Sequence, residues 1–196
     1  MAVSSSQRAV RVMPRRLAAL AEFVARKEGV RLRAIDLAVV GRREIVALNR
    51  RWLGHDRPTD VLSFDLSDAG RPGARTGGRR ADSTRASGEG LCAQIVVCGE
   101  VAAKQARRLG LPPQQELMLY VVHGLLHLMG YDDQAARAAA RMHAREEELL
   151  RAFLSPSGRE HQSRARIPKS EIQSDQFAGP QGRPAGSRGR KPPEKR

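Results

Sequence analysis

Apolar residues recur along the first 154 positions with two different periods. Spacings of three and four residues are typical of amphipathic helices, whereas alternation and short apolar runs are typical of strands. The helical spacing occupies residues 14–28, 44–53, 100–109, 114–129 and 135–153. Strand-like runs occupy residues 33–40, 59–66 and 91–98. Helices and strands are interleaved, but two of the strands are joined by a loop. The pattern therefore predicts an α+β fold, a small mixed sheet with helices packed on it.

Two segments have no apolar period. Residues 67–90 are rich in Gly, Ser, Arg and Asp, which predicts a long mobile insertion between two strands. Residues 155–196 contain only three bulky apolar residues, Ile167, Ile172 and Phe177. So little apolar surface cannot offset the entropy of ordering, so we expect a disordered basic tail. A single domain is expected over residues 1–154.

The chain is strongly basic, with a formal net charge of +14 at pH 7. The expected tail has ten basic against four acidic residues and contributes +6, which leaves +8 on the first 154 residues. A basic folded part is typical of proteins that bind polyanions. The alternative is an arginine-rich composition without a functional meaning.

The two cysteines, Cys92 and Cys98, lie in one strand-like run. Six residues of extended chain would separate them by roughly 20 Å, so we expect core positions and neither a disulfide nor a shared metal. No apolar run reaches the length of a membrane span, and the first twelve residues lack the apolar region of a signal peptide. These features predict a cytoplasmic protein without a membrane partner.

The sequence HGLLHLMGYDD, which begins at His123, holds the strongest chemical signal. His123 and His127 are four residues apart in an apolar run, so their imidazoles share one helix face and can reach one ion. Gly130 allows the chain to leave the helix in a left-handed conformation, and the turn can bring Asp132 or Asp133 back to that ion. Two histidines and a carboxylate with one open position are typical of catalytic zinc. A buried helix whose histidines bond to backbone carbonyls is the alternative.

The same sequence matches the HExxHxxGxxH pattern of the zinc metzincin proteases with two differences. Gly124 stands in the place of the catalytic Glu, and Asp133 in the place of the third His. In those proteases the Glu is the general base that takes a proton from the metal-bound water. Its absence argues against peptide hydrolysis. Phosphodiester hydrolysis needs above all a cation at the phosphate, so it remains compatible with the motif.

Together with RPTDVLSFDL at residues 57–66, the metal motif closely resembles the YbeY family of bacterial rRNA maturation factors. The resemblance covers roughly residues 35–154, without the insertion. It implies a zincin-like metal helix that holds one Zn²⁺ through His123, His127 and Asp133. It also implies a single-strand-specific endoribonuclease used in 16S rRNA 3′-end maturation and ribosome quality control. The implied partners are rRNA and the small ribosomal subunit.

Two departures from the family pattern concern the metal motif and a strand. The motif closes with Asp133 where many members have His. Asp132 is the rival ligand, but it corresponds to the aspartate that precedes the ligand in the family, which favours Asp133. The strand at residues 91–98 contains Ala93-Gln94 where Gly-Asp or Gly-Glu is usual.

A third departure concerns the handling of RNA. Leu53 stands where the family often has an arginine implicated in that role, so Arg51 and Arg57 are candidate phosphate contacts in its place. Trp52 is either a stacking platform for an RNA base or a core residue. The nucleophile stays open between a metal-bound water and the ribose 2′-OH, and no catalytic side chain is assigned.

Several other polar residues have two interpretations. Thr59, Asp60 and Ser63 either line the cleft near the metal or turn the chain into the strand. His55 and His143 are expected to face solvent. Two further functions remain as alternatives: a non-catalytic ribosome assembly factor with a structural metal, and a metalloprotease-like hydrolase.

Overall fold

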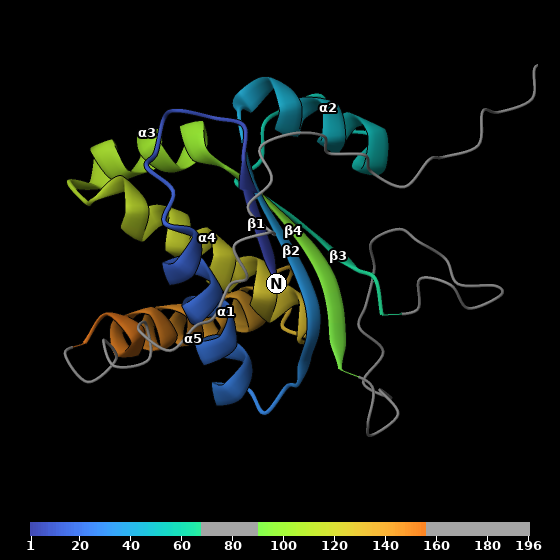
Figure 1. The fold of residues 1–196 in the computed structure, drawn as a ribbon, viewed down its shortest axis with the longest axis vertical. Coiled ribbons are helices and arrows are strands. Elements are labelled where there is room, and N and C mark those ends of the chain that lie inside the picture. The colour runs from blue at the N-terminus through green and yellow to red at the C-terminus, as the bar shows by residue number, and fades with distance from the viewer. Residues whose placement is uncertain (68–89, 156–196) are drawn as a thin grey trace, which may run out of the picture.

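The computed structural model describes residues 1–67 and 90–155, so the predicted insertion and tail, apart from their end residues 67, 90 and 155, lie outside the described residues. The fold is α+β, as predicted (Figure 1). The four strands are β1 (Ala2–Ser5), β2 (Leu32–Val40), β3 (Val61–Asp65) and β4 (Leu91–Cys98). The five helices of the described part are α1 (Pro14–Lys27), α2 (Arg42–Leu53), α3 (Gly99–Leu109), α4 (Pro113–Leu128) and α5 (Ala136–Leu154).

The strands form one mixed sheet in the order β1-β2-β4-β3. β2 pairs in parallel with both β1 and β4, whereas β3 pairs antiparallel with β4. Strand β1 was not predicted from the sequence. Its four residues, AVSS, include two serines and are too few to show an alternation of apolar and polar residues. Val3 is buried in the core where β1 pairs with β2 opposite Leu37.

Alternation along the strands divides the core between the two faces of the sheet. The odd-numbered residues of β2 and β4, such as Leu37 and Ile95, belong to the larger cluster together with residues of α1, α4 and α5. Their neighbours Ala38 and Val96 belong to a smaller cluster with Ile45 of α2. Figure 1 shows α1, α4 and α5 on one side of the sheet, with α2 separate from them. Burial on both faces explains the nearly continuous apolar runs of β2 and β4.

Helix α4 is the central helix of this arrangement. It contacts α1, α3, α5, β3 and β4, and ten of its sixteen residues are buried. A helix that is apolar on nearly all sides belongs inside a protein. The two histidines therefore sit in a rigid element surrounded by packed neighbours.

The helix starts differ slightly from the predicted ones, and α2 shows why. It begins at Arg42, two residues earlier than its apolar spacing suggested, and its N-cap residue Gly41 has no capping side chain. Instead, Glu100 of α3 accepts a hydrogen bond from the backbone N–H of Arg42 at 2.8 Å. A carboxylate from another helix thus supplies the cap. Within the described ranges, no helix has the length and apolar character needed to cross a membrane.

Candidate metal centre

The structure brings three of the predicted side chains together at the end of α4. The Nε2 atoms of His123 and His127 lie 2.9 Å apart. Oδ2 of Asp133 lies 3.7 Å from Nε2 of His127 and 4.0 Å from Nε2 of His123. The side chains are 17%, 30% and 42% exposed for His123, His127 and Asp133, so the group is half-buried and open on one side.

The ring of His123 is held from behind by a buried carboxylate. Nδ1 of His123 lies 2.8 Å from Oε1 of Glu146 on α5, whose side chain is only 6% exposed. Burial alone would lower the pKa of His123, but the hydrogen bond and the negative charge of Glu146 outweigh it and raise that pKa. Because the carboxylate accepts a hydrogen bond from the Nδ1–H, the other nitrogen of His123, Nε2, is left to face Asp133.

The ring of His127 is held by a backbone carbonyl. Its Nδ1 lies 3.1 Å from the carbonyl oxygen of Tyr131. A carbonyl can only accept, so Nδ1 of His127 carries the hydrogen and Nε2 carries a lone pair. The alternative in which the histidines bond to backbone carbonyls therefore holds for one nitrogen of His127. The other nitrogen, Nε2, faces His123 and Asp133.

The turn that provides this carbonyl depends on Gly130. The N–H of Gly130 donates to the carbonyl of His127 at 3.1 Å, and the N–H of Tyr131 donates to that of Leu126 at 3.0 Å. These two bonds form a Schellman motif, which requires a positive φ at its glycine. Gly130 has φ 96°, a value that side chains disfavour. The turn directs the chain back over the end of α4 toward the histidines.

The donor set fits a cation. When both imidazoles are neutral and their Nδ1 atoms act as donors, two Nε2 lone pairs and a carboxylate oxygen converge, and such groups repel one another unless a cation lies among them. Zinc ligands at about 2.0–2.1 Å from the ion stand roughly 3.3 Å apart in a tetrahedron. The separations of 2.9, 3.7 and 4.0 Å bracket this value. His123, His127 and Asp133 are therefore a suitable set of three metal ligands with a fourth position open.

The structure separates Asp133 from its rival Asp132. Oδ1 of Asp132 accepts a hydrogen bond from the backbone N–H of Gln134 at 3.1 Å, so this side chain stabilises the turn. Only Asp133 groups with the two histidines.

Asp60 turns the chain into β3 and also adds negative charge beside the site. Its Oδ1 accepts from the N–H of Val61 at 2.9 Å and from the hydroxyl of Thr59 at 3.0 Å. Its charge also helps to raise the pKa of His123. The side chains of Thr59, Asp60 and Ser63 are all partly exposed. Asp60 therefore both turns the chain into β3 and lies close enough to the metal centre to act on His123.

The residues proposed to handle RNA lie on and after α2. Arg51 and Arg57 are exposed, and Leu53 is 48% exposed at the end of the helix. The guanidinium carbon of Arg51 lies 5.5 Å from the centroid of the Trp52 ring. Trp52 also packs edge-on against Phe64 with centroids 5.8 Å apart, and it borders the smaller core cluster.

The other two histidines in the described part of the chain differ from one another. His55 is exposed, as expected. His143 is also largely exposed, but its Nδ1 lies 3.2 Å from Oε2 of Glu146. Burial would raise the pKa of Glu146, but its bonds with His123 and His143 lower it. Glu146 is the site residue that the sequence analysis missed, since it stands among three consecutive glutamates on a helix with a charged face. Only the packing of α5 on α4 reveals it.

The cysteines are both free, and Cys98 is fully buried at the start of α3. Burial raises the pKa of the Cys98 thiol. Neither cysteine belongs to the His123 group. Cys98 fills core space, as the sequence suggested.

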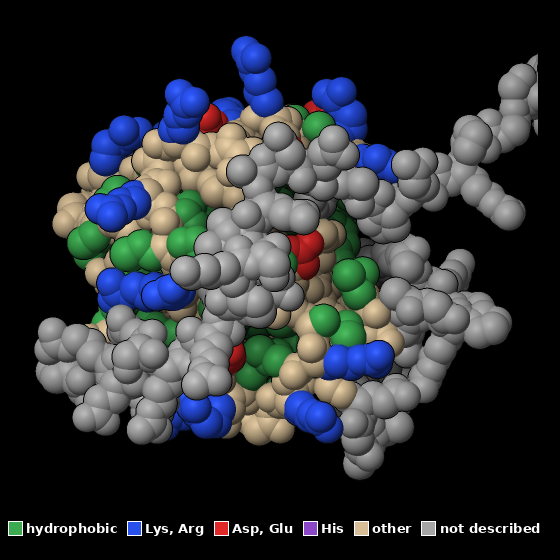
Figure 2. Space-filling view, viewed as in Figure 1, with side chains coloured by type: hydrophobic (Ala, Val, Ile, Leu, Met, Phe, Trp, Pro, Cys, Tyr) green, Lys and Arg blue, Asp and Glu red, His purple; other side chains and the backbone are tan. Residues whose placement is uncertain are grey.

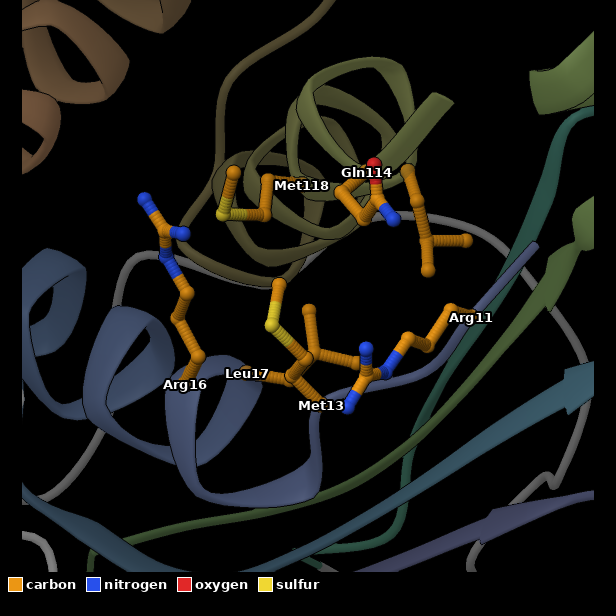
Figure 3. Close-up of a pocket in the computed structure, with 7 residues that line it drawn as sticks. Arg11, Met13, Arg16, Leu17, Gln114 and Met118 are labelled. Atoms are coloured by element: carbon orange, nitrogen blue, oxygen red, sulfur yellow. The ribbon is translucent and has the colours of Figure 1, made fainter. Parts of the chain in front are cut away.

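A small pocket lies at the opposite end of α4 (Figure 3). It is lined by Arg11, Met13, Arg16, Leu17, Gln114, Leu117 and Met118. Gln114 and His127 are thirteen residues apart, which corresponds to about 20 Å of helix, and no residue of the proposed metal site lines the pocket. Figure 2 shows Lys and Arg side chains distributed around one face of the molecule without a single dense patch.

Comparison with known proteins identifies the family. Residues 3–154 match the family described as Endoribonuclease YbeY. Proteins of that name from Beutenbergia cavernae and Acidothermus cellulolyticus are 36% and 37% identical, over 77% and 70% of this chain and 95% and 82% of theirs. A solution structure of TM1509 from Thermotoga maritima is 24% identical over 81% of this chain and 94% of that chain, with a TM-score of 0.48. The resemblance expected from the metal motif is confirmed, and this chain belongs to the YbeY family.

Proposed function

We propose that this chain is a zinc-dependent endoribonuclease that cleaves single-stranded rRNA during maturation of the 16S 3′ end and in ribosome quality control. The observation that carries the proposal is the convergence of two imidazole lone pairs and the Asp133 carboxylate at the end of α4. Membership of an endoribonuclease family supplies the substrate class. The proposed catalytic domain spans residues 1–154, and rRNA as substrate implies action in the cytoplasm beside the small ribosomal subunit.

His123, His127 and Asp133 would hold the ion. Zinc supplies a Lewis acid, which neutralises charge on a phosphoryl oxygen or makes a water more acidic. The protein fixes the two imidazoles through Glu146 and the Tyr131 carbonyl, so the ligands need not reorganise when the ion binds.

The phosphate charge is offset by arginines in this proposal. Arg51 and Arg57 are exposed and come from α2 and the loop that precedes β3. Asn49, which is buried, donates from Nδ2 to the carbonyl oxygen of Arg57 at 2.7 Å. This bond ties the loop to α2 and thus restrains the backbone that carries Arg57.

Glu146 does not take the place of the protease general base. Glu146 contacts Nδ1 of His123, on the far side of the ring from Nε2, so it cannot reach a water beside the converging Nε2 atoms. Cleavage of RNA can instead use its own 2′-OH or a water as nucleophile. The product ends, a 2′,3′-cyclic phosphate or a 5′-phosphate, distinguish these two routes.

The test combines metal content with RNA cleavage. Purified wild-type protein should contain one zinc per chain by elemental analysis and should cut single-stranded rRNA fragments that span the 16S 3′ end. His123→Ala and Asp133→Ala should lose both the metal and the cleavage. Asp132→Ala, the matched control, should keep both. Cleavage that survives in metal-free His123→Ala would overturn the proposal.

A second function is favoured by one observation, the lack of a general base at Gly124. A non-catalytic assembly factor with a structural metal would need none. In that case the wild-type protein would bind one zinc and associate with small subunits, yet leave the single-stranded fragments uncut.

A further inference from the structure

A hydrogen-bonded trio links three separate elements beside the metal centre. The hydroxyl of Tyr131 donates to Oε2 of Glu28 at 3.0 Å, and Nε of Arg145 donates to Oε1 of the same glutamate at 2.8 Å. Glu28 follows α1 directly, Tyr131 follows the Gly130 turn, and Arg145 belongs to α5. The partners of Glu28 are 103 and 117 residues away in the sequence.

The trio is partly buried, which makes it stronger than a surface contact. The side chain of Glu28 is 11% exposed and that of Arg145 is 26% exposed. Each oxygen of the Glu28 carboxylate accepts a hydrogen bond of its own, which offsets the cost of removing this charge from water. An exposed ion pair would hold its members far less firmly.

Tyr131 connects this trio to both parts of the metal centre. Its backbone carbonyl accepts a hydrogen bond from Nδ1–H of His127, and the chain reaches Asp133 two residues later. The backbone at Tyr131 therefore orients the imidazole of His127. It also begins the segment that places the Asp133 carboxylate beside the histidines. Its side chain is anchored to α1 and, through Glu28, to α5.

We propose that Tyr131, Glu28 and Arg145 are positioning residues that hold the ligand turn in register with α4. This inference rests on the proposed metal site and deepens it. With Arg145 and Glu146 adjacent on α5, one helix aligns both histidines: Glu146 contacts His123 directly, and Arg145 acts on His127 through Glu28 and Tyr131.

Tyr131→Phe is the most informative substitution, because it removes the hydroxyl and keeps the ring and the carbonyl. We expect its zinc affinity, measured by competition with a chromophoric chelator, to fall about tenfold, the lower end of what outer contacts to metal ligands usually contribute. The melting temperature of its metal-free form should change by no more than a few degrees. Glu28→Gln should give an intermediate loss, since its amide oxygen can still accept one of the two bonds.

Glu148→Gln is the matched control. Glu148 is the other partner of Arg145, at 2.6 Å, and is 64% exposed on the outer side of α5. Its substitution removes an ion pair of the same arginine and leaves the bonds of Glu28 in place. The zinc affinity of this variant should stay within twofold of wild type.

A second readout works without metal. In ¹⁵N spectra of the metal-free protein, His127 should be in the Nδ1–H form, and Tyr131→Phe should shift it toward a mixture of tautomers. Unchanged zinc affinity and an unchanged tautomer in Tyr131→Phe would overturn the inference. An equal loss of affinity in Glu148→Gln would do so as well. Neither readout uses RNA, so a wild-type protein that binds zinc but cuts no RNA would contradict the proposed nuclease alone.

Discussion

Gly124 on α4 lies directly against Val61 on β3. A Cβ added at Gly124 would come within 3.0 Å of Cγ2 of Val61 and within 3.3 Å of Cγ2 of Ile95. The residue after the first histidine is therefore at a point where the metal helix lies closely against the sheet. The position that holds the general base in metzincins is here used for packing between helix and sheet.

Gly124→Glu should therefore damage the fold without creating a peptidase. A charged side chain forced between α4 and the sheet is both overpacked and desolvated, and we expect the free energy of unfolding to fall by about 3 kcal/mol or more. Urea titration measures this change, and casein turnover in zinc buffer measures any peptidase activity. A stable Gly124→Glu protein that cleaves casein would contradict this account.

Replacing Glu146 should weaken metal binding through His123. The carboxylate accepts from Nδ1 of both His123 and His143, whereas the amide of Glu146→Gln has only one acceptor oxygen. We expect zinc affinity to fall about tenfold, as is typical when a partner of a ligating histidine is lost. His143→Ala is the control. It removes the exposed partner and keeps the bond to His123, so its affinity should stay within about threefold of wild type.

Removal of the metal should lower stability without unfolding the protein. The core is built from helices packed on both faces of the sheet and does not include the three proposed ligands. A ligand present at a thousand times its Kd adds about 4 kcal/mol to stability. Chelation should therefore lower the melting temperature by about 10 °C for a chain of this size, with a single cooperative transition. His123→Ala should show no chelator-dependent shift, and a chelator-dependent shift in that variant would place the metal elsewhere.

Salt dependence tests the two candidate phosphate contacts. Arg57→Ala and Arg51→Ala should each weaken binding to single-stranded RNA and reduce the slope of log K against log salt by about 0.7. Arg15→Ala removes the same charge near the start of α1, the end far from Glu28 and the metal centre, and should leave the slope unchanged. Equal effects of all three substitutions would mean that only the net charge of the chain matters.

The sequence predicted the parts of the site that are local in the chain. His123 and His127 share a helix face because of the helical period, and Gly130 marks the end of that helix. Local geometry allows either Asp132 or Asp133 to be the third metal ligand, and the family pattern favours Asp133. In the structure, Asp132 accepts a hydrogen bond from the backbone N–H of Gln134, and Asp133 lies beside the two histidines.

The parts that depend on tertiary packing could not be predicted. Glu146 resembles its exposed neighbours in sequence, and it becomes buried only because α5 packs against α4. The same is true of β1, whose short polar sequence forms a strand only beside β2. In the sequence, Gly124 is informative because it replaces the glutamate that acts as general base in metzincins. Its close approach to Val61 follows from the packing of β3 against α4, which the sequence does not reveal.

The antiparallel pairing of β3 with β4 also decides where this protein can tolerate foreign sequence. Asp65 stands opposite Ala93, and the N–H of Leu66 donates to the carbonyl of Cys92 at 2.8 Å, so the two ends of the intervening connection are clamped side by side. They lie at the end of β3 away from Val61, about 13 Å along the strand from that contact with Gly124. A fluorescent reporter or an affinity handle grafted between these ends would leave both the sheet and the histidines undisturbed.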